Sequence, residues 1–306
     1  MPIIYDKNYQ EQLQEMSDVL ELINYRPRTK ESYLNSVAEC CEWLGSTYHI
    51  SIDEAAVSHL RAFLAYLHCP IDKGGRGLMP RTINVYNCSI KRFFQFILKK
   101  ELTSRDLPVM KVDNPLPKVP SKKEAAILIM GTENPKHRLM LAMAYGCALR
   151  MTEVISLRFG DISFSRNLVT VRAENSKNRC EETVVLPANL RAMLYSYYHD
   201  CMKGARQEDW LFPGRRAGTH ISKGVPGRVI RRRLEKLGWS SRGYSFHSLR
   251  HAHALHYYLA GADIHQVQVR LRHRSISSTT VYVRLAGMLQ ERRNIENPFD
   301  DPAFKG

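Results

Sequence analysis

The sequence changes character at residues 109–123, VMKVDNPLPKVPSKK. Pro115, Pro117 and Pro120 fall close together there, and proline lacks the backbone N–H that a helix interior needs. A helix therefore cannot continue through this stretch, which favours an extended connector. We predict a linker at residues 111–122, between an N-terminal domain at 1–110 and a C-terminal domain at 123–306.

The two predicted domains differ in charge. The first 110 residues hold 13 Lys and Arg and 13 Asp and Glu, and the remainder holds 32 and 17 of the totals of 45 and 30. The net charge of +15 therefore belongs to the C-terminal part. Clustered Lys and Arg gain free energy by displacing condensed counterions from a polyanion. Nucleic acid is the first partner class that this favours, ahead of an anionic membrane or a merely soluble basic surface.

Helical periodicity dominates the N-terminal domain. Thr29 is a candidate N-cap for the second helix, and Ser51 with Glu54 has the spacing of a capping box at the start of the third. A Gly/Pro loop separates the third helix from the fourth. Four helices are predicted, at about 9–23, 30–44, 51–67 and 81–100.

Beyond the linker the pattern is mixed. Helices are predicted from about 123, at HRLMLAMAYGCAL and at TEVISLRF, and then two alternating strands, NLVTVRA and TVVLP, joined by a polar turn. Further helices follow to the end. The predicted fold class is therefore mostly α with a small β-sheet (α+β).

Targeting and redox signals are lacking in the sequence. No basic segment followed by an apolar run opens the chain, and no stretch approaches ~18 uninterrupted apolar residues, so the cytoplasm is the default compartment. The seven cysteines are odd in number and form no CxxC. This favours reduced, buried thiols over a disulfide framework.

The segment FHSLRHAHALHYYLAGADIHQVQVRLRHRSISSTTVYVRL carries the chemistry. His247 and His251 are four apart and could share a metal ligand site, but no HExxH and no carboxylate pair completes one, so no metal is predicted. His247 and Arg250 can both project from one helix end toward a phosphate. A second helix is predicted from the N-cap Asp263 to near His273.

The single tyrosine at the end of this segment lies in a further short helix. Ser277 is the predicted cap of that helix, and Tyr282 lies within its first turns. A phenol with a pKa of about 10 is a poor nucleophile at pH 7 unless cations accept the developing charge. Three other histidines, His251, His253 and His256, are predicted to be surface or core-edge residues.

These residues resemble the signature of the tyrosine recombinases, the phage-integrase family. In that family His-x-x-Arg, a later His, and a Tyr nine residues beyond it occur in order, as His247, Arg250, His273 and Tyr282 do. The upstream segment GCALRMTEVISLRFGDI is similar to the part of the family signature that holds its first catalytic arginine, here Arg150. The helices RPRTKESYLNSVAECCEWL and PRTINVYNCSIKRFFQFI resemble its N-terminal core-binding domain.

The sequence departs from the family pattern at two places. The usual Leu-Gly-His is Leu271-Arg272-His273, which places a cation where the family turns on glycine. The family's Gly-Lys-Gly hairpin is replaced by AENSKNRCEET, and a short insertion places the catalytic lysine at Lys177 rather than near Glu174.

The resemblance implies a site-specific recombinase that cuts and rejoins double-stranded DNA at paired half-sites through a 3′-phosphotyrosine. Such an enzyme needs no cofactor. It acts in the integration, excision or resolution of DNA, for example of mobile elements. Glu153 is implied as support for an arginine. The implied catalytic residues are Arg150, Lys177, His247, Arg250, His273 and Tyr282. Of these, His247 would assist proton removal or bind a phosphate oxygen, and His273 would donate a hydrogen bond to another oxygen.

DNA contacts and assembly also follow from the resemblance together with the basic charge. The arginines of RVIRRRLEKL could instead form a solvated helix face, but phosphate contact is at least as well supported. A homotetramer on DNA, linked by the tail after Tyr282, is implied. The predicted DNA contacts are Arg26, Arg28, Thr29, Arg81, Lys91, Arg228, Arg231, Arg232 and Arg272.

Two functions of other kinds fit part of the pattern. A type IB topoisomerase uses similar chemistry on one duplex without partner exchange. A non-enzymatic DNA-binding regulator accounts for the charge and the helices, but not for the ordered catalytic residues.

Overall fold

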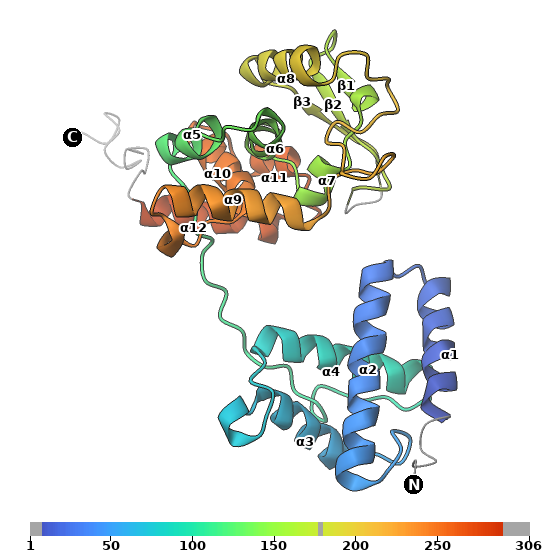
Figure 1. Cartoon of the computed structure of the whole chain (residues 1–306). Coiled ribbons are helices and arrows are strands. Elements are labelled where there is room, and N and C mark those ends of the chain that lie inside the picture. The colour runs from blue at the N-terminus through green and yellow to red at the C-terminus, as the bar shows by residue number, and fades with distance from the viewer. Residues whose placement is uncertain (1–7, 177–179, 290–306) are drawn as a thin grey trace, which may run out of the picture. The chain divides into compact units, whose positions relative to one another are not determined.

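The computed structural model describes residues 8–176 and 180–289 (Figure 1). The chain divides into two compact units between Asn114 and Pro115. This division lies inside the segment predicted as the linker, and residues 108–121 form neither helix nor strand.

The N-terminal unit consists of the four predicted helices. They are α1 (Asn8–Leu22), α2 (Pro27–Tyr48), α3 (Val57–His68) and α4 (Pro80–Phe96). Their apolar stripes meet in one core that includes Leu44, Phe63, Ile90 and Phe93. The helical periodicity of the sequence predicted this core because each stripe must be buried against another helix.

Two predicted helix starts in this unit are wrong. Arg26, not Thr29, is the N-cap of α2, because Pro27 occupies the first helical position, where its missing N–H costs nothing. The Ser51 N–H and hydroxyl do donate to the Glu54 carboxylate, at 3.0 and 2.9 Å. That pair closes a turn which buries Ile52 in the core, and α3 begins only at Val57.

The C-terminal unit is built around the apolar helix α6 (Pro135–Gly146), which is buried from Leu139 to Ala144. It packs against α5, α8 and α10. Because α10 carries His247 and Arg250, this packing ties the site to the core. The other helices are α5 (Lys122–Met130), α7 (Met151–Ile155), α8 (Ala188–Cys201), α9 (Gly224–Lys236), α10 (Phe246–Leu259), α11 (Ile264–Leu271) and α12 (Thr280–Met288).

A small antiparallel sheet lies at one side of this unit, in the order β1-β2-β3 (Figure 1). Its strands are β1 (Ile162–Ser163), β2 (Leu168–Val171) and β3 (Glu182–Val185). The second and third are the two predicted strands, paired from Leu168 with Val185 to Val171 with Glu182. The sequence did not indicate β1, because two residues are too few to show alternation.

The predicted caps of the last two helices had different outcomes. Asp263 caps α11, where its carboxylate accepts from the Gln266 N–H at 2.8 Å. Ser277 does not cap α12, whose N-cap is Thr279. The Ser275 hydroxyl accepts from the Ser277 N–H and forms a separate 3-10 turn first, which shifts the helix start by two residues.

The predicted burial of the cysteines is only partly correct. Cys40, Cys41 and Cys147 are buried, whereas Cys88, Cys180 and Cys201 are exposed. The number and spacing of the cysteines carry no information on which helix face a thiol occupies, so they could not predict its burial. No helix in the described ranges has both the length and the apolar character needed to cross a bilayer.

Candidate active site

The arginine of the HSLR motif is buried in the C-terminal unit. Arg250, on α10, is 2% exposed, and its guanidinium donates to the carbonyl oxygens of Ala148 and Leu271. Leu271 ends α11, so its carbonyl has no partner within the helix and accepts this bond instead. Two segments far apart in sequence therefore fix one guanidinium.

Arg150 reaches the same helix end from another direction. It is the N-cap of α7, and its guanidinium donates to Glu153 at 2.7 Å and to the Arg272 carbonyl oxygen at 3.1 Å. The Arg150 side chain keeps 15% of its surface exposed. The end of α11 thus holds the two arginines, Arg150 and Arg250, that were predicted to bind phosphate oxygens.

Glu153 lies beneath these cations. The sequence predicted that it supports one arginine, and in the structure its carboxylate lies 2.5 Å from Arg272, 2.7 Å from Arg150 and 3.8 Å from Arg250. The residue is 1% exposed. Burial by itself would raise the pKa of Glu153, but Arg272, Arg150 and Arg250 hold it below its usual 4.5. One ionised carboxylate therefore keeps three guanidinium groups together.

The arginine pair carries a strong positive field. Burial, followed by repulsion from Arg150, lowers the pKa of Arg250 to about 9, so Arg250 remains charged at pH 7. Two like charges held this close in a water-poor site gain free energy when an anion arrives between them. Guanidinium forks match the oxygens of phosphate and carboxylate groups in geometry, and a phosphate diester is one such anion.

Tyr282 belongs to the same cluster. It lies on α12, is 1% exposed, and its hydroxyl is 2.8 Å from Nδ1 of His251. Burial raises the pKa of Tyr282 to about 12, against the opposing effect of Arg250 and Arg150. The phenol is therefore neutral in the free protein, and it lies within the field of the arginine pair.

The two predicted catalytic histidines lie at the start of α10 and just after α11. His247 is exposed on α10, and its ring centre lies 5.6 Å from that of His251. Partial burial of the His247 ring, with Arg250 and Arg150 nearby, lowers its pKa. His273 follows α11, and its Nδ1 lies 3.0 Å from the Thr279 hydroxyl, at the N-cap of α12.

The spacing of His247 and His251 had also suggested a shared metal ligand site. In the structure His251 bonds to Tyr282 instead. Across residues 8–176 and 180–289, no three His, Cys, Asp or Glu side chains are grouped so that they could hold a metal ion.

Arg272 does not have the surface position that was predicted for a DNA contact. It is 7% exposed, and its guanidinium pairs with Glu153 at 2.5 Å and with Glu182 at 3.2 Å. Its backbone is left-handed, with φ +54°, at the C-cap of α11. The chain turns here as glycine would turn it, and the charged side chain folds inward to join the Glu153 cluster.

This geometry separates two effects of Arg272 that substitutions can measure. Arg272→Gly and Arg272→Ala both remove a partner of the buried Glu153, so both variants should be less stable than the wild type. Glycine adopts φ +54° without strain, so we expect Arg272→Gly to exceed Arg272→Ala by ~1 kcal/mol in free energy of unfolding. Urea unfolding of both variants measures the difference, and equal stabilities would contradict the strain assignment.

The other predicted DNA contacts are distributed over both units. Arg28 and Arg81 are exposed in the first turns of α2 and α4, and both line one cavity of about 450 Å³. Lys91 is half-buried on α4. The two helices begin with the same three residues, Pro-Arg-Thr, so the sequence places an arginine at the same point of each.

The α9 arginines do not all face the same way. Arg228 and Arg232 are exposed and line a cavity of about 510 Å³ together with Arg215 and Lys236. Arg231 lies 3.9 Å from Glu235 on its own helix and is not among the lining residues. A basic cavity and a solvated helix face therefore occur on one helix.

Two predictions lie outside the described residues: Lys177, and the tail beyond Leu289. The residue before Lys177 is described. Ser176 is buried, and its hydroxyl lies 3.5 Å from Glu182, which pairs with Arg272. The described residues Ser176 and Glu182 are thus linked to the Glu153 cluster through Arg272.

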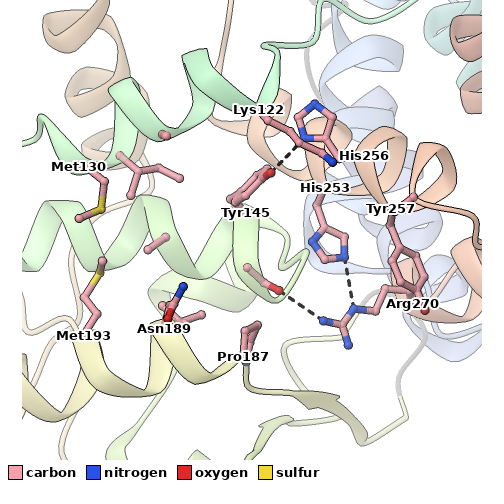
Figure 2. A pocket seen from close by; sticks show the side chains of 16 residues that line it. Lys122, Met130, Tyr145, Pro187, Asn189, Met193, His253, His256, Tyr257 and Arg270 are labelled. Atoms are coloured by element: carbon pink, nitrogen blue, oxygen red, sulfur yellow. Dashed lines mark hydrogen bonds between the residues drawn. The ribbon is translucent and has the colours of Figure 1, made fainter. Parts of the chain in front are cut away.

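A groove of about 600 Å³ opens on another part of this unit, among α5, α6, α8, α10 and α11 (Figure 2). Figure 2 shows Met130 and Met193 at one end and Lys122, His253 and Arg270 at the other. Arg270 Nε donates to Nε2 of His253 at 3.3 Å. The groove therefore combines an apolar floor with two cations.

Comparison with known proteins identifies the class. Residues 122–287 match the model of the phage integrase family, and residues 13–103 match its N-terminal SAM-like domain. The chain belongs to the phage integrase family. It is a tyrosine recombinase, and this assignment favours site-specific DNA recombination over a topoisomerase or a non-enzymatic regulator.

Similar proteins include both curated relatives and solved structures. A putative integrase/recombinase of Sinorhizobium fredii is 30% identical over 274 residues, covering 89% of this recombinase and 84% of that protein. The tyrosine recombinase XerD of Pseudomonas putida is 28% identical, covering 84% and 87%. The fold resembles XerH bound to its difH substrate before cleavage, with a TM-score of 0.67 at 17% identity, covering 92% of this chain and 88% of that one.

Sequence reasoning missed two members of the recombinase site. His251 was predicted to be a surface or core-edge residue, but it contacts the predicted nucleophile. Its position one turn beyond His247 and next to Arg250 was the available signal. Arg272 was recognised as unusual, but the sequence could not show that its side chain turns inward.

Proposed function

We propose that this recombinase cuts one DNA strand at a time by attack of the Tyr282 hydroxyl on a phosphate held by Arg150 and Arg250. The observation that supports this most is that the buried phenol lies within the field of both arginines. With a pKa of about 12, on the order of one phenol in 10⁵ is ionised at pH 7, so the cations must stabilise the attack. The product is a 3′-phosphotyrosine that stores the bond for rejoining to a second strand.

The remaining predicted residues have distinct roles in this proposal. His247 and His273 donate hydrogen bonds to phosphate oxygens, and Glu153 holds the arginines in place. Lys177 protonates the departing 5′ oxygen, and its assignment over Glu174 is supported because it is the only lysine between Lys136 and Lys203. The chain's own side chains supply all of these groups, so the proposal includes no cofactor.

Trapping the covalent intermediate tests this function. A nicked suicide duplex loses the strand needed for religation, so the wild-type protein should accumulate as a protein–DNA adduct on denaturing gels. Two marked duplexes should then exchange strands, which distinguishes recombination from the nicking and closing of a topoisomerase. Failure to form an adduct on a duplex that the protein binds would overturn the proposal.

Lys177 offers a chemical test of its own. Lys177→Ala should cut an ordinary substrate about 10²-fold to 10⁴-fold more slowly, because the 5′ oxygen leaves without a proton. A 5′-bridging sulfur is a better leaving group that needs no proton, so this substrate should restore the rate. Glu174→Ala serves as the control. An inactive Glu174→Ala together with failed rescue of Lys177→Ala would show that the lysine is misplaced.

We further propose that both units bind one double-stranded half-site, like a clamp joined by the linker. The arginines at the starts of α2 and α4 and the basic cavity beside α9 support phosphate contacts from each unit. The predicted contacts Arg26, Thr29 and Lys91 belong to the same proposal. The cytoplasm, where DNA is accessible, is the proposed compartment.

We also propose that the protein assembles into a homotetramer on paired half-sites through the tail after Tyr282. The tail sequence NPFDDPAFKG has two aromatic residues, Phe299 and Phe304, with the adjacent Asp300 and Asp301 between them. The groove in Figure 2 offers the complement, because its apolar floor lies beside Lys122 and Arg270. On DNA, the tail of a neighbouring protomer is the proposed occupant of this groove. In the free protein, the protomer's own tail is proposed to occupy it.

Truncation after Arg292 tests this assembly. It should leave binding to a single half-site intact and remove cooperative binding to paired half-sites, as measured by gel shift. Met130→Glu, in the groove, should behave in the same way, and Tyr195→Glu, at an exposed position on α8 outside the groove, should not. Normal synaptic complexes and recombination by the truncated protein would contradict the proposed role of the tail.

A further inference from the structure

The hydroxyl of Tyr282 is already hydrogen-bonded in the free protein. Nδ1 of His251 lies 2.8 Å from Oη, and the two ring centres are 5.9 Å apart. Of the two other histidines in the site, His247 contacts the His251 ring, and His273 bonds to Thr279. In the described part of the chain, His251 is therefore the imidazole placed to exchange a proton with the nucleophile.

We propose that His251 is a catalytic residue that accepts the proton of Tyr282 as the phenol attacks DNA. This inference rests on the proposed function and adds a role to a residue that the family signature leaves without one. It requires neutral imidazole with its ring proton on Nε2, so that Nδ1 accepts from the tyrosine hydroxyl.

The surroundings of His251 keep it neutral. The groups that face it are His247 and Arg250 on its own helix and Tyr282 on α12. Burial, followed by repulsion from His247 and Arg250, lowers the pKa of His251 to about 4. When a phosphate binds between Arg150 and Arg250, its negative charge offsets those cations, so the proton affinity of His251 rises at the moment of attack.

In the proposed step two protons move while one bond to phosphorus replaces another. Oη forms a bond to phosphorus while the bond between phosphorus and the 5′ oxygen breaks. The Oη proton moves to Nδ1 of His251, and the 5′ oxygen takes a proton from a separate donor, proposed above to be Lys177. In rejoining, a 5′ hydroxyl attacks the phosphotyrosine and returns its proton to that separate donor, while the departing phenolate takes its proton back from Nδ1.

The competing interpretation is that His251 only holds Tyr282 in its buried position. His251→Asn distinguishes the two, because the asparagine side-chain oxygen occupies nearly the place of Nδ1 and accepts a hydrogen bond, but it takes up no proton at pH 7. We expect single-turnover cleavage of a suicide duplex to slow about 10²-fold or more in both His251→Asn and His251→Ala. Wild-type rates in His251→Asn, or faster cleavage by His251→Ala, would overturn the assignment.

Three comparisons make the test specific. The substrate with a 5′-bridging sulfur should leave the His251 variants slow while it rescues Lys177→Ala, because the two residues act on different oxygens. Added imidazole should restore part of the rate to His251→Ala and none to Tyr282→Phe. His199→Gln, which replaces an exposed histidine at the end of α8, should cleave at the wild-type rate.

The outcomes also separate this inference from the proposed function. Absence of an adduct with the wild-type protein overturns both. An active wild type with active His251→Asn overturns the proton-transfer role alone. Duplex affinity and thermal unfolding of each variant, compared with the wild type, show whether a slow rate arises from chemistry or from lost folding.

Discussion

Replacing Tyr282 with phenylalanine should abolish the covalent protein–DNA adduct. The change removes one oxygen and no charge, so the apolar packing of the ring on α10 and α11 is kept. The lost hydrogen bond to His251 costs about 1 kcal/mol of stability, too little to unfold the domain. Gel shift should therefore show duplex binding within about twofold of the wild type, since phosphate contacts supply most of the affinity.

The same variant tests the identity of the nucleophile against its neighbours. Tyr257 and Tyr258 lie on α10 and are the controls, because Tyr257→Phe and Tyr258→Phe should both still form the adduct. Adduct formation by Tyr282→Phe would show that another residue attacks. Loss of duplex binding in that variant would show that the hydroxyl has a structural role that the proposed mechanism does not include.

Removing the charge of Glu153 should have the largest effect on stability. Glu153→Gln leaves three guanidinium groups around a neutral amide in a buried site. Breaking a buried ion pair by removing one partner costs about 3–5 kcal/mol, because the remaining charge is uncompensated. We expect a loss of that size in urea unfolding at pH 7, with reduced cleavage because Arg150 and Arg250 are no longer held.

The pH dependence of this loss has a definite sign. The pKa of Glu153 is lower in the folded protein than its usual 4.5, so its ionised form stabilises the fold above that pH. This contribution is lost as the pH falls through the lowered pKa. The stability difference between wild type and Glu153→Gln should thus be full at pH 7 and shrink below about pH 4.5.

A surface glutamate provides the matched control. Glu133 pairs with Lys236 at 2.9 Å, but its side chain is 83% exposed. Solvent screens such a pair, so Glu133→Gln should leave the urea midpoint unchanged. A loss in Glu153→Gln no larger than in this control would contradict the role assigned to the buried carboxylate.

The sequence by itself determined the class of the fold and the order of the site residues. Helical periodicity predicted the helices of both units because each apolar stripe must be buried. Alternation predicted β2 and β3, and the family signature selected Arg150, His247, Arg250, His273 and Tyr282 at their spacings. These features are local or ordered along the chain, which is why they can be read without coordinates.

Only the tertiary structure decided which side chains meet. His251 acquires its contact because α10 packs against α12 thirty-one residues later, and periodicity does not show which helix faces which. Arg272 turns inward because the left-handed end of α11 directs it at Glu153, so a cation predicted for the surface belongs to the buried cluster. Charge and exposure depend on packing between distant segments, and that packing is not encoded in any short stretch of the sequence.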